Sequence, residues 1–419
     1  MIDFPAAILQ IVFGIILLSF YHPFFILYGI LLIILMYVVF KYTATKGIET
    51  SIKESKEKYK VAHWIQEIAR SLMSFKLSGK TQLAMQRNDA LTADYLDARE
   101  NHFKILVIQF IQLIGFKILV TAGLLVIGGL LVLNQQMNIG QFVAAEIIIL
   151  LLIGSVEKVI TGLETFYDVL TSLEKIGQVV DKPLEAQTGA DPFEKKQPLK
   201  IELEDVSVST QEGNEILKNL NLTLKANARV FLDGGSGSGK ATLLKLLSGL
   251  IHPSKGSLYI NSTSIEGIWP NKYRSYVSQV LPDQHPFEGT ILENITFGDP
   301  TISNDRIHDV LKNVGLLQFI KQQPNGLQTT IYPEGQQIPY TISKRIVLAR
   351  AIVNEPQVLL LKDPLEHFDT EEALEIIKYL TDYNQPWALV VSSRNPIWRK
   401  YCPHTITLQN GFLKTNLDA

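Results

Sequence analysis

The sequence has almost no cysteine and almost no net charge. Cys402 is the single cysteine among 419 residues, so no disulfide can form within the chain. The formal net charge of −2 argues against nucleic acid as the main partner. Charged residues make up only 19% of the chain and hydrophobic residues 47%. This balance is too apolar for an ordinary soluble protein and favours a chain with a membrane part.

Four apolar stretches in the first part of the chain predict four membrane spans. Residues 1–5 carry no basic residue, which argues against a signal peptide and for helices that stay in the membrane. The two short loops within the hairpins lack Lys and Arg, whereas basic residues recur from Lys46 to Arg99. The positive-inside rule therefore places both termini on the cytoplasmic side of the cytoplasmic (inner) membrane. We place the spans near residues 6–20, 24–42, 103–133 and 141–170.

The segment 43–102 between the second and third spans is rich in helix formers. Its strongest break is at residues 74–81. We expect a cytoplasmic insert of two helices that prolong the spans, joined by a short turn. No alternating pattern of strands supports a separate soluble domain there.

Lys117, Glu146 and Glu157 are charged residues that lie well inside the predicted spans. Lys117 lies sixteen positions before residue 133 and Glu157 sixteen positions after residue 141. At about 1.5 Å per residue, both lie roughly 24 Å below the outer loop. Two interpretations remain open: Lys117 and Glu157 pair, or Lys117 reaches the inner membrane boundary alone.

A glycine-rich loop at residues 234–241 matches the phosphate-binding pattern GxxxxGK[ST] at every position but the last. In this pattern, backbone N–H groups and the Lys contact phosphates, and the final hydroxyl holds Mg²⁺. Ala241 has no hydroxyl. A strand predicted at 228–232 and a helix predicted at 242–250 give the loop the setting that anion binding requires. The candidate nucleotide contacts are Gly234, Ser236, Gly237, Ser238, Gly239, Lys240, Ala241 and Thr242.

Further motifs follow the loop in a fixed order. They are the Tyr-Val-Ser-Gln segment that ends at Gln279, residues 286–295, residues 348–351 and the apolar strand 358–361. With the phosphate loop, this order resembles the nucleotide-binding domain of ABC transporters, and Gln279 takes the place of the glutamine in the family's Q-loop. The four spans resemble the last four of the six helices in an ABC-exporter half transporter. The abrupt start of the chain then fits a truncated form that lacks the first two helices.

The resemblance implies the fold, the ligand and the partners. We expect an α-helical membrane domain at 1–180, with four transmembrane helices and long cytoplasmic extensions. A linker at 181–198 and an α/β P-loop nucleotide-binding domain of ABC type at 199–419 follow. The family implies ATP as cofactor, ATP-driven export as function, the lipid bilayer as surroundings, and a homodimer or a heterodimer with another ABC half transporter.

The positions that the family uses for catalysis depart from its pattern. Thr210 falls where an aromatic residue stacks on adenine. Lys362 and Asp363 follow the strand where the family has an Asp that positions Mg²⁺ and a Glu that polarises water. With Ala241, both protein groups that would hold Mg²⁺ are lost, so we expect no metal site. Ser393 stands at the position of the switch histidine.

The family signature, which closes on the partner's nucleotide, is also altered. Its five positions are Ile338, Pro339, Tyr340, Thr341 and Ile342. In the family, each ATP site combines the phosphate loop of one chain with the signature segment of the other. The altered signature of this chain would therefore impair the ATP site of its partner as well. The resemblance implies an exporter, but these residues predict impaired hydrolysis. The alternative is a pseudo-ATPase that acts as a structural or regulatory partner, or a truncated, decaying copy.

Lys362 allows two interpretations. Its ammonium group could neutralise phosphate charge where Mg²⁺ would lie, which would permit metal-free nucleotide binding. Alternatively, it points outward or pairs with Asp363 or Asp369.

Overall fold

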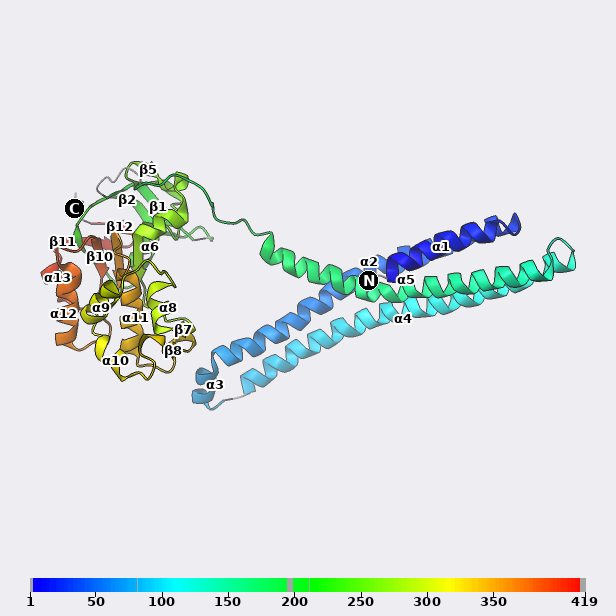
Figure 1. Cartoon of the computed structure of the whole chain (residues 1–419), viewed down its shortest axis with the longest axis horizontal. Helices are drawn as coiled ribbons and strands as arrows, with labels where there is room; N and C mark the ends of the chain where they lie inside the picture. The colour runs from blue at the N-terminus through cyan, green and yellow to red at the C-terminus, as the bar shows by residue number, and fades with distance from the viewer. Residues whose placement is uncertain (1–2, 81, 194–198, 211, 415–419) are drawn as a thin grey trace. The chain divides into compact units, whose positions relative to one another are not determined.

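The computed structural model describes residues 3–80, 82–193, 199–210 and 212–414. These residues form two compact units, Met1–Pro183 and Leu184–Ala419 (Figure 1). Each unit has its own buried core. The predicted division into domains lies close to this boundary, although residues 194–198 of the predicted linker lie outside the described part.

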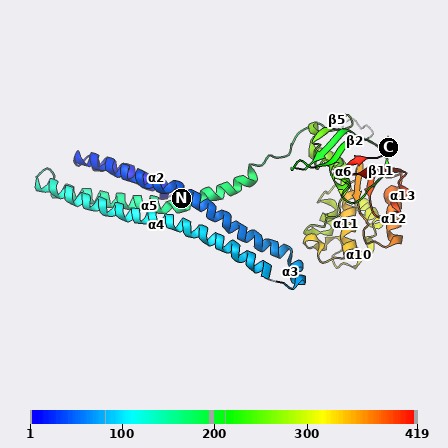
Figure 2. The ribbon, with the colours of Figure 1, turned by 180° about the vertical axis from the view of Figure 1, so that it is seen from behind.

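The N-terminal unit consists of long helices. They are α1 (Asp3–Ser19), α2 (Phe24–Arg70), the short α3 (Leu72–Ser78), α4 (Gln82–Leu133) and α5 (Ile139–Val180). Helix α1 packs along α5, and α2 packs along α4, as the view from behind shows (Figure 2). A capping box starts α5, in which Gln141 N donates to Asn138 Oδ1 at 2.7 Å and Asn138 N donates to Gln141 Oε1 at 3.0 Å.

Two of these helices, α4 and α5, are long and apolar enough to cross a membrane, among the residues that the structure describes. The first two predicted spans fall on shorter apolar helical stretches, Pro5–Ser19 and Phe24–Tyr37. In the predicted turn at 74–81, residues 74–78 belong instead to the short helix α3. This helix ends at Ser78, because Gly79 caps it in the left-handed conformation with φ 62°, and residue 81 lies outside the described residues.

The C-terminal unit holds two larger sheets and one small one. The first sheet has the order β2-β1-β4-β5, from β2 (Glu215–Lys225), β1 (Lys200–Ser209), β4 (Lys255–Ile260) and β5 (Thr263–Ser264). The second has the order β12-β11-β3-β10-β9-β6, from β12 (Phe412–Leu413), β11 (His404–Gln409), β3 (Arg229–Asp233), β10 (Ala388–Ser392), β9 (Val358–Lys362) and β6 (Val277–Val280). Strands β11, β3, β10, β9 and β6 run parallel. Strands β7 (Gly289–Thr290) and β8 (Thr330–Ile331) form the third sheet.

Helices cover the parallel sheet. The α-helices are α6 (Lys240–Leu247), α7 (Pro270–Tyr276), α8 (Ile291–Thr296), α9 (Asn304–Asn313), α10 (Leu317–Gln322), α11 (Tyr340–Ile352), α12 (Thr370–Thr381) and α13 (Trp398–Tyr401). Strands β9 and β10 are buried almost throughout, as expected for parallel strands covered on both faces. Ligands of open α/β sheets bind at the carboxyl ends of the parallel strands, so we expect a binding site at this edge of the sheet.

Part of the predicted linker is built into the C-terminal unit. Ala190 forms a parallel bridge with Ile268, and the Phe193 side chain is buried, with its ring centroid 4.2 Å from that of Tyr276. Residues 190 and 193, which the sequence analysis placed in the linker, therefore contact the C-terminal unit. The apolar area that Phe193 buries explains why this segment packs on the unit.

Candidate functional site

The phosphate loop connects β3 to α6, and its glycines allow close backbone approach. Gly234 has φ 143° and Gly239 has φ 100°. A Cβ atom on Gly234 would lie 2.3 Å from the carbonyl oxygen of Leu408, and one on Gly239 would lie 2.7 Å from Leu217 Cδ2. Helix α6 begins at Lys240, two residues earlier than predicted, because Gly239 already caps it in the left-handed conformation. The helix ends at Leu247 rather than at residue 250, where Gly249 turns the chain with φ 68°.

Lys240 folds back over the loop. Its Nζ donates hydrogen bonds to the carbonyl oxygens of Gly234 and Gly235, each at 2.6 Å, and lies 3.4 Å from Ser238 Oγ. Burial lowers the pKa of Lys240, and the nearby charge of Lys362 lowers it further. A position of Lys362 near the phosphate loop was one of the two interpretations that the sequence allowed.

Lys362 ends β9 at the same edge of the sheet. Strand β9 lies between β10 and β6, with Lys362 opposite Ser392, and α6 contacts β9. The Lys362 side chain is half-buried. Across the described residues, no ion pair joins Lys362 to Asp363 or to Asp369, so the predicted alternative of such a pair is not present.

Asp363, which takes the place of the family's glutamate, is held by the segment after β10. Its backbone adopts φ 44°, and its N–H donates to the Ser392 carbonyl oxygen at 2.8 Å. Its Oδ1 accepts a hydrogen bond from the Arg394 N–H at 3.0 Å. Ser393 Oγ accepts from the Asn395 N–H at 3.2 Å. Both side chains are therefore engaged with backbone N–H groups of one turn.

Gln279 has a buried side-chain amide without a partner. Neither its Nε2 nor its Oε1 forms a hydrogen bond with any described residue. A buried unpaired amide is costly, so its presence at the carboxyl edge of β6 points to a ligand that binds there. The sequence identified this residue only through its resemblance to the Q-loop.

The residues present suit phosphate better than a metal ion. The loop N–H groups, Lys240, Lys362 and the Gln279 amide can contact phosphate oxygens. Mg²⁺ prefers oxygen ligands in octahedral geometry, but Ala241 supplies none and Lys362 is a cation. The described residues also contain no cluster of three His, Cys, Asp or Glu side chains that could hold a metal. The site therefore lacks the two protein ligands with which the family's pattern holds Mg²⁺.

The signature segment begins α11. Pro339 precedes the first helical residue, and the exposed ring of Tyr340 lies 5.5 Å from the His367 ring in edge-to-face contact. Lys344 Nζ lies 5.1 Å from the Tyr340 ring centroid. Ile338, Thr341 and Ile342 are half-buried. Within the described part of the chain, no hydrogen bond or ring contact joins these five positions to the phosphate loop.

Thr210 lies at the end of β1 in an exposed turn. Its N–H donates to the Asn214 carbonyl oxygen at 2.9 Å, and its Oγ1 accepts from the Asn214 N–H at 3.2 Å. The side chain is therefore used to close the turn and has no ring to stack on a base.

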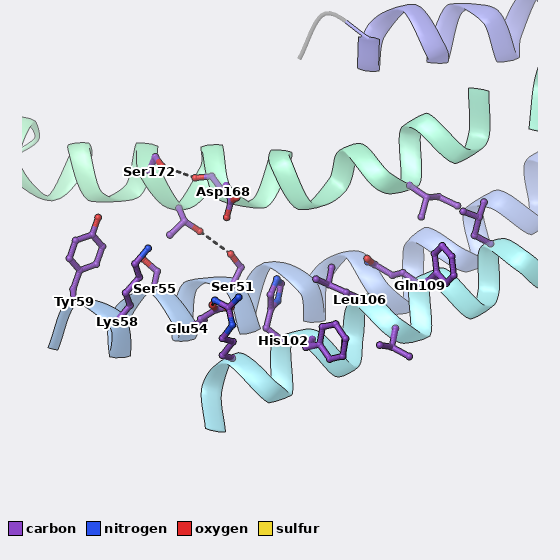
Figure 3. Close-up of a pocket in the computed structure, with 17 residues that line it drawn as sticks. Ser51, Glu54, Ser55, Lys58, Tyr59, His102, Leu106, Gln109, Asp168 and Ser172 are labelled. Carbon is purple, nitrogen blue, oxygen red and sulfur yellow. Dashed lines mark hydrogen bonds and ion pairs between the residues drawn. The ribbon is translucent and has the colours of Figure 1, made fainter. Parts of the chain in front are cut away.

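The N-terminal unit contains a cavity of about 960 Å³ between α2, α4 and α5 (Figure 3). Its lining changes along α4 from the charged Arg99 to the apolar Leu113. Arg99 Nη1 lies 3.3 Å from Glu54 Oε1, and the hydroxyl groups of Ser51 on α2 and Thr171 on α5 form a hydrogen bond at 3.4 Å. The predicted spans gave no indication of this cavity, because it depends on how three helices pack.

Comparison with known proteins identifies the C-terminal unit. Residues 217–366 match the family model described as ABC transporter, which covers the phosphate loop, Gln279 and Lys362. The chain resembles an exporter-type ABC half transporter. A probable multidrug resistance ABC transporter ATP-binding/permease protein of Bacillus subtilis is 30% identical over 46% of this chain and 29% of its own length. The alpha-hemolysin translocation ATP-binding protein HlyB of Escherichia coli is 26% identical over 67% of this chain and 40% of its own length.

The ABC-exporter fold extends over the whole chain. A bacterial Atm1-family ABC exporter with ATP bound matches it with a TM-score of 0.88 at 18% identity, covering 98% of this chain and 73% of the other. The predicted fold class, helices of transmembrane type followed by an α/β ABC nucleotide-binding domain, is confirmed. An ABC transporter domain implies ATP binding. The chain spans less than half the length of the two curated relatives described above.

Proposed function

We propose that this chain is a membrane subunit of an ABC exporter that binds ATP but hydrolyses it poorly. Its N-terminal unit would lie in the cytoplasmic (inner) membrane and its ABC domain in the cytoplasm. The subunit would pair with a second copy or with another ABC half transporter. This proposal makes it a nucleotide-responsive, structural or regulatory partner in transport.

The observation that carries the proposal is the carboxyl edge of the parallel sheet. Lys362 and Ala241 stand where the metal would need oxygen ligands, and the Asp363 carboxylate accepts a hydrogen bond from the Arg394 N–H. Phosphoryl transfer in P-loop enzymes depends on the metal to spread charge over the transferring group. The loop and Lys240 remain, so binding and hydrolysis are separable here.

The signature segment extends the defect to the partner. Pro339 has no N–H to offer a phosphate, and the Tyr340 and Thr341 side chains occupy positions where glycines would allow close approach. A partner's site completed by this segment would bind its nucleotide weakly. The loss of both the metal-binding positions and the signature segment is also compatible with a decaying copy. Such a copy would not bind nucleotide at all.

The test uses the full chain in lipid nanodiscs. ATP binding is measured by displacement of a fluorescent ATP analogue, and hydrolysis by phosphate release. We expect saturable binding that Lys240→Ala abolishes and that Lys321→Met, an exposed lysine on α10, leaves unchanged. Phosphate release should stay at the level of Lys240→Ala. Turnover that is lost in Lys240→Ala would show an active ATPase, and absence of binding would leave a decayed copy.

A further inference from the structure

We propose that Lys362 takes the place of the divalent cation, so that this site binds ATP without a metal ion. This inference rests on the proposed function, because it requires that the chain binds ATP. The inference states which group neutralises the negative charge of the ATP phosphates, and the family resemblance does not imply a lysine in this role.

The position of Lys362 supports this role. Parallel pairing sets Lys362 opposite Ser392 at the end of β9, and α6, which begins with Lys240, contacts β9. The side chain of Lys362 is half-buried at this edge and forms no ion pair with any described residue. A partly buried ammonium without a counter-ion is costly, and a phosphate oxygen would supply the missing charge.

The neighbouring acidic groups are already engaged. Asp233 Oδ2 lies 2.5 Å from an Arg399 guanidinium nitrogen, and the Asp363 carboxylate accepts from the Arg394 N–H at 3.0 Å. Lys362 lies close enough to Lys240 for its charge to lower the pKa of Lys240. The cations Lys240, Lys362, Arg394 and Arg399 outnumber the carboxylates of Asp233 and Asp363 at this edge, and this excess of positive charge favours a polyanion and repels a further cation.

The unpartnered amide of Gln279 completes the argument. It lies on β6, the strand next to β9, and its two polar atoms are buried without hydrogen bonds to described residues. Its Nε2 can donate to a phosphate oxygen that Lys362 also contacts. This arrangement would hold the nucleotide, but it would not order a metal ion that promotes transfer of the terminal phosphoryl group. Nucleotide occupancy would then be independent of the free Mg²⁺ concentration.

The experiment titrates ATP against the full chain in nanodiscs, once in excess Mg²⁺ and once in excess EDTA. We expect the two dissociation constants to agree within about threefold. Lys362→Met should weaken binding in EDTA by about tenfold or more, because it removes a charge-assisted hydrogen bond. The double variant Ala241→Ser with Lys362→Asp, which restores oxygen ligands, should bind only when Mg²⁺ is present. Lys321→Met is the matched control and should behave as the wild type.

Each outcome decides between the two proposals. Wild-type binding that falls more than about tenfold in EDTA, while Lys240→Ala abolishes binding in Mg²⁺, would overturn the role of Lys362 and leave the proposed function intact. Unchanged affinity of Lys362→Met in EDTA would do the same. Absence of wild-type binding in both buffers would overturn both. Protection of the buried Cys402 thiol in each variant verifies that the ABC unit is folded.

Discussion

Lys117 Nζ on α4 lies 2.7 Å from Glu157 Oε2 on α5. Both residues lie in the apolar stretches that suit a membrane, and their side chains are 34% and 43% exposed in the single chain. Charges at such depth are costly in lipid unless they are neutralised. The pair therefore joins two long helices by a charged contact beside the apolar core of the N-terminal unit.

The attraction between Lys117 and Glu157, and not either charge by itself, should stabilise the N-terminal unit. Lys117→Met removes the ion pair that joins α4 to α5, so the thermal midpoint in detergent should fall. Lys117→Met combined with Glu157→Gln should recover part of the loss, with a coupling energy of about 1 kcal/mol for a partly exposed pair. Strictly additive effects of the two single substitutions would show that the contact contributes nothing.

A second prediction concerns the close approach of α2 and α5. A Cβ atom on Gly47 would lie 2.6 Å from Tyr167 Cε2, and the ring is almost fully buried. The Tyr167 hydroxyl accepts a hydrogen bond from Gln109 Nε2 at 3.2 Å, so the ring cannot move freely. Gly47→Ala should destabilise the N-terminal unit by about 1–3 kcal/mol through overpacking. Gly115→Ala, where nothing lies within 4 Å of the added atom, is the control and should not destabilise.

The sequence predicted local features well and features that depend on strand register poorly. The phosphate loop follows from glycines and a lysine close together in the chain. Counting residues along two helices placed Lys117 and Glu157 at a similar depth and left their pairing as one of two interpretations. The hydrogen bond from the Arg394 N–H to Asp363 joins residues 31 positions apart and exists only because β9 and β10 pair in parallel. The isolated amide of Gln279 likewise becomes visible only when its surroundings are known.

Arg229 is a further residue that the sequence did not single out. It was included in an apolar strand, yet its fully buried guanidinium donates to the carbonyl oxygens of Thr381 at 3.1 Å and Asp382 at 2.6 Å, and to that of Trp387. Arg229→Met should destabilise the ABC unit by about 2–4 kcal/mol, because those carbonyls lose their donor. Chemical denaturation of the full chain measures this loss. Lys225→Met, an exposed change at the end of β2, is the control, and an equal effect of both would contradict the prediction.

The single cysteine gives a direct probe of the same unit. Burial raises the pKa of the Cys402 thiol to about 12, and the side chain is only 1% exposed. The thiolate is the reactive form, so at about pH 8 only roughly one native molecule in 10⁴ would carry it. We expect maleimide labelling, followed by mass spectrometry, to be slow in the native protein and fast in denaturant.

The same raised pKa sets the sign of a pH effect. The unfolded thiol loses its proton near about pH 8.5, whereas the folded one keeps its proton up to about 12, so the folded state binds more protons between these values. Stability from this group is therefore complete below about pH 8.5 and is lost as the pH rises toward 12. Labelling should accelerate over that range more steeply than the ionisation of a free thiol predicts. Rapid labelling of the native protein at neutral pH would contradict both the burial and the raised pKa of Cys402.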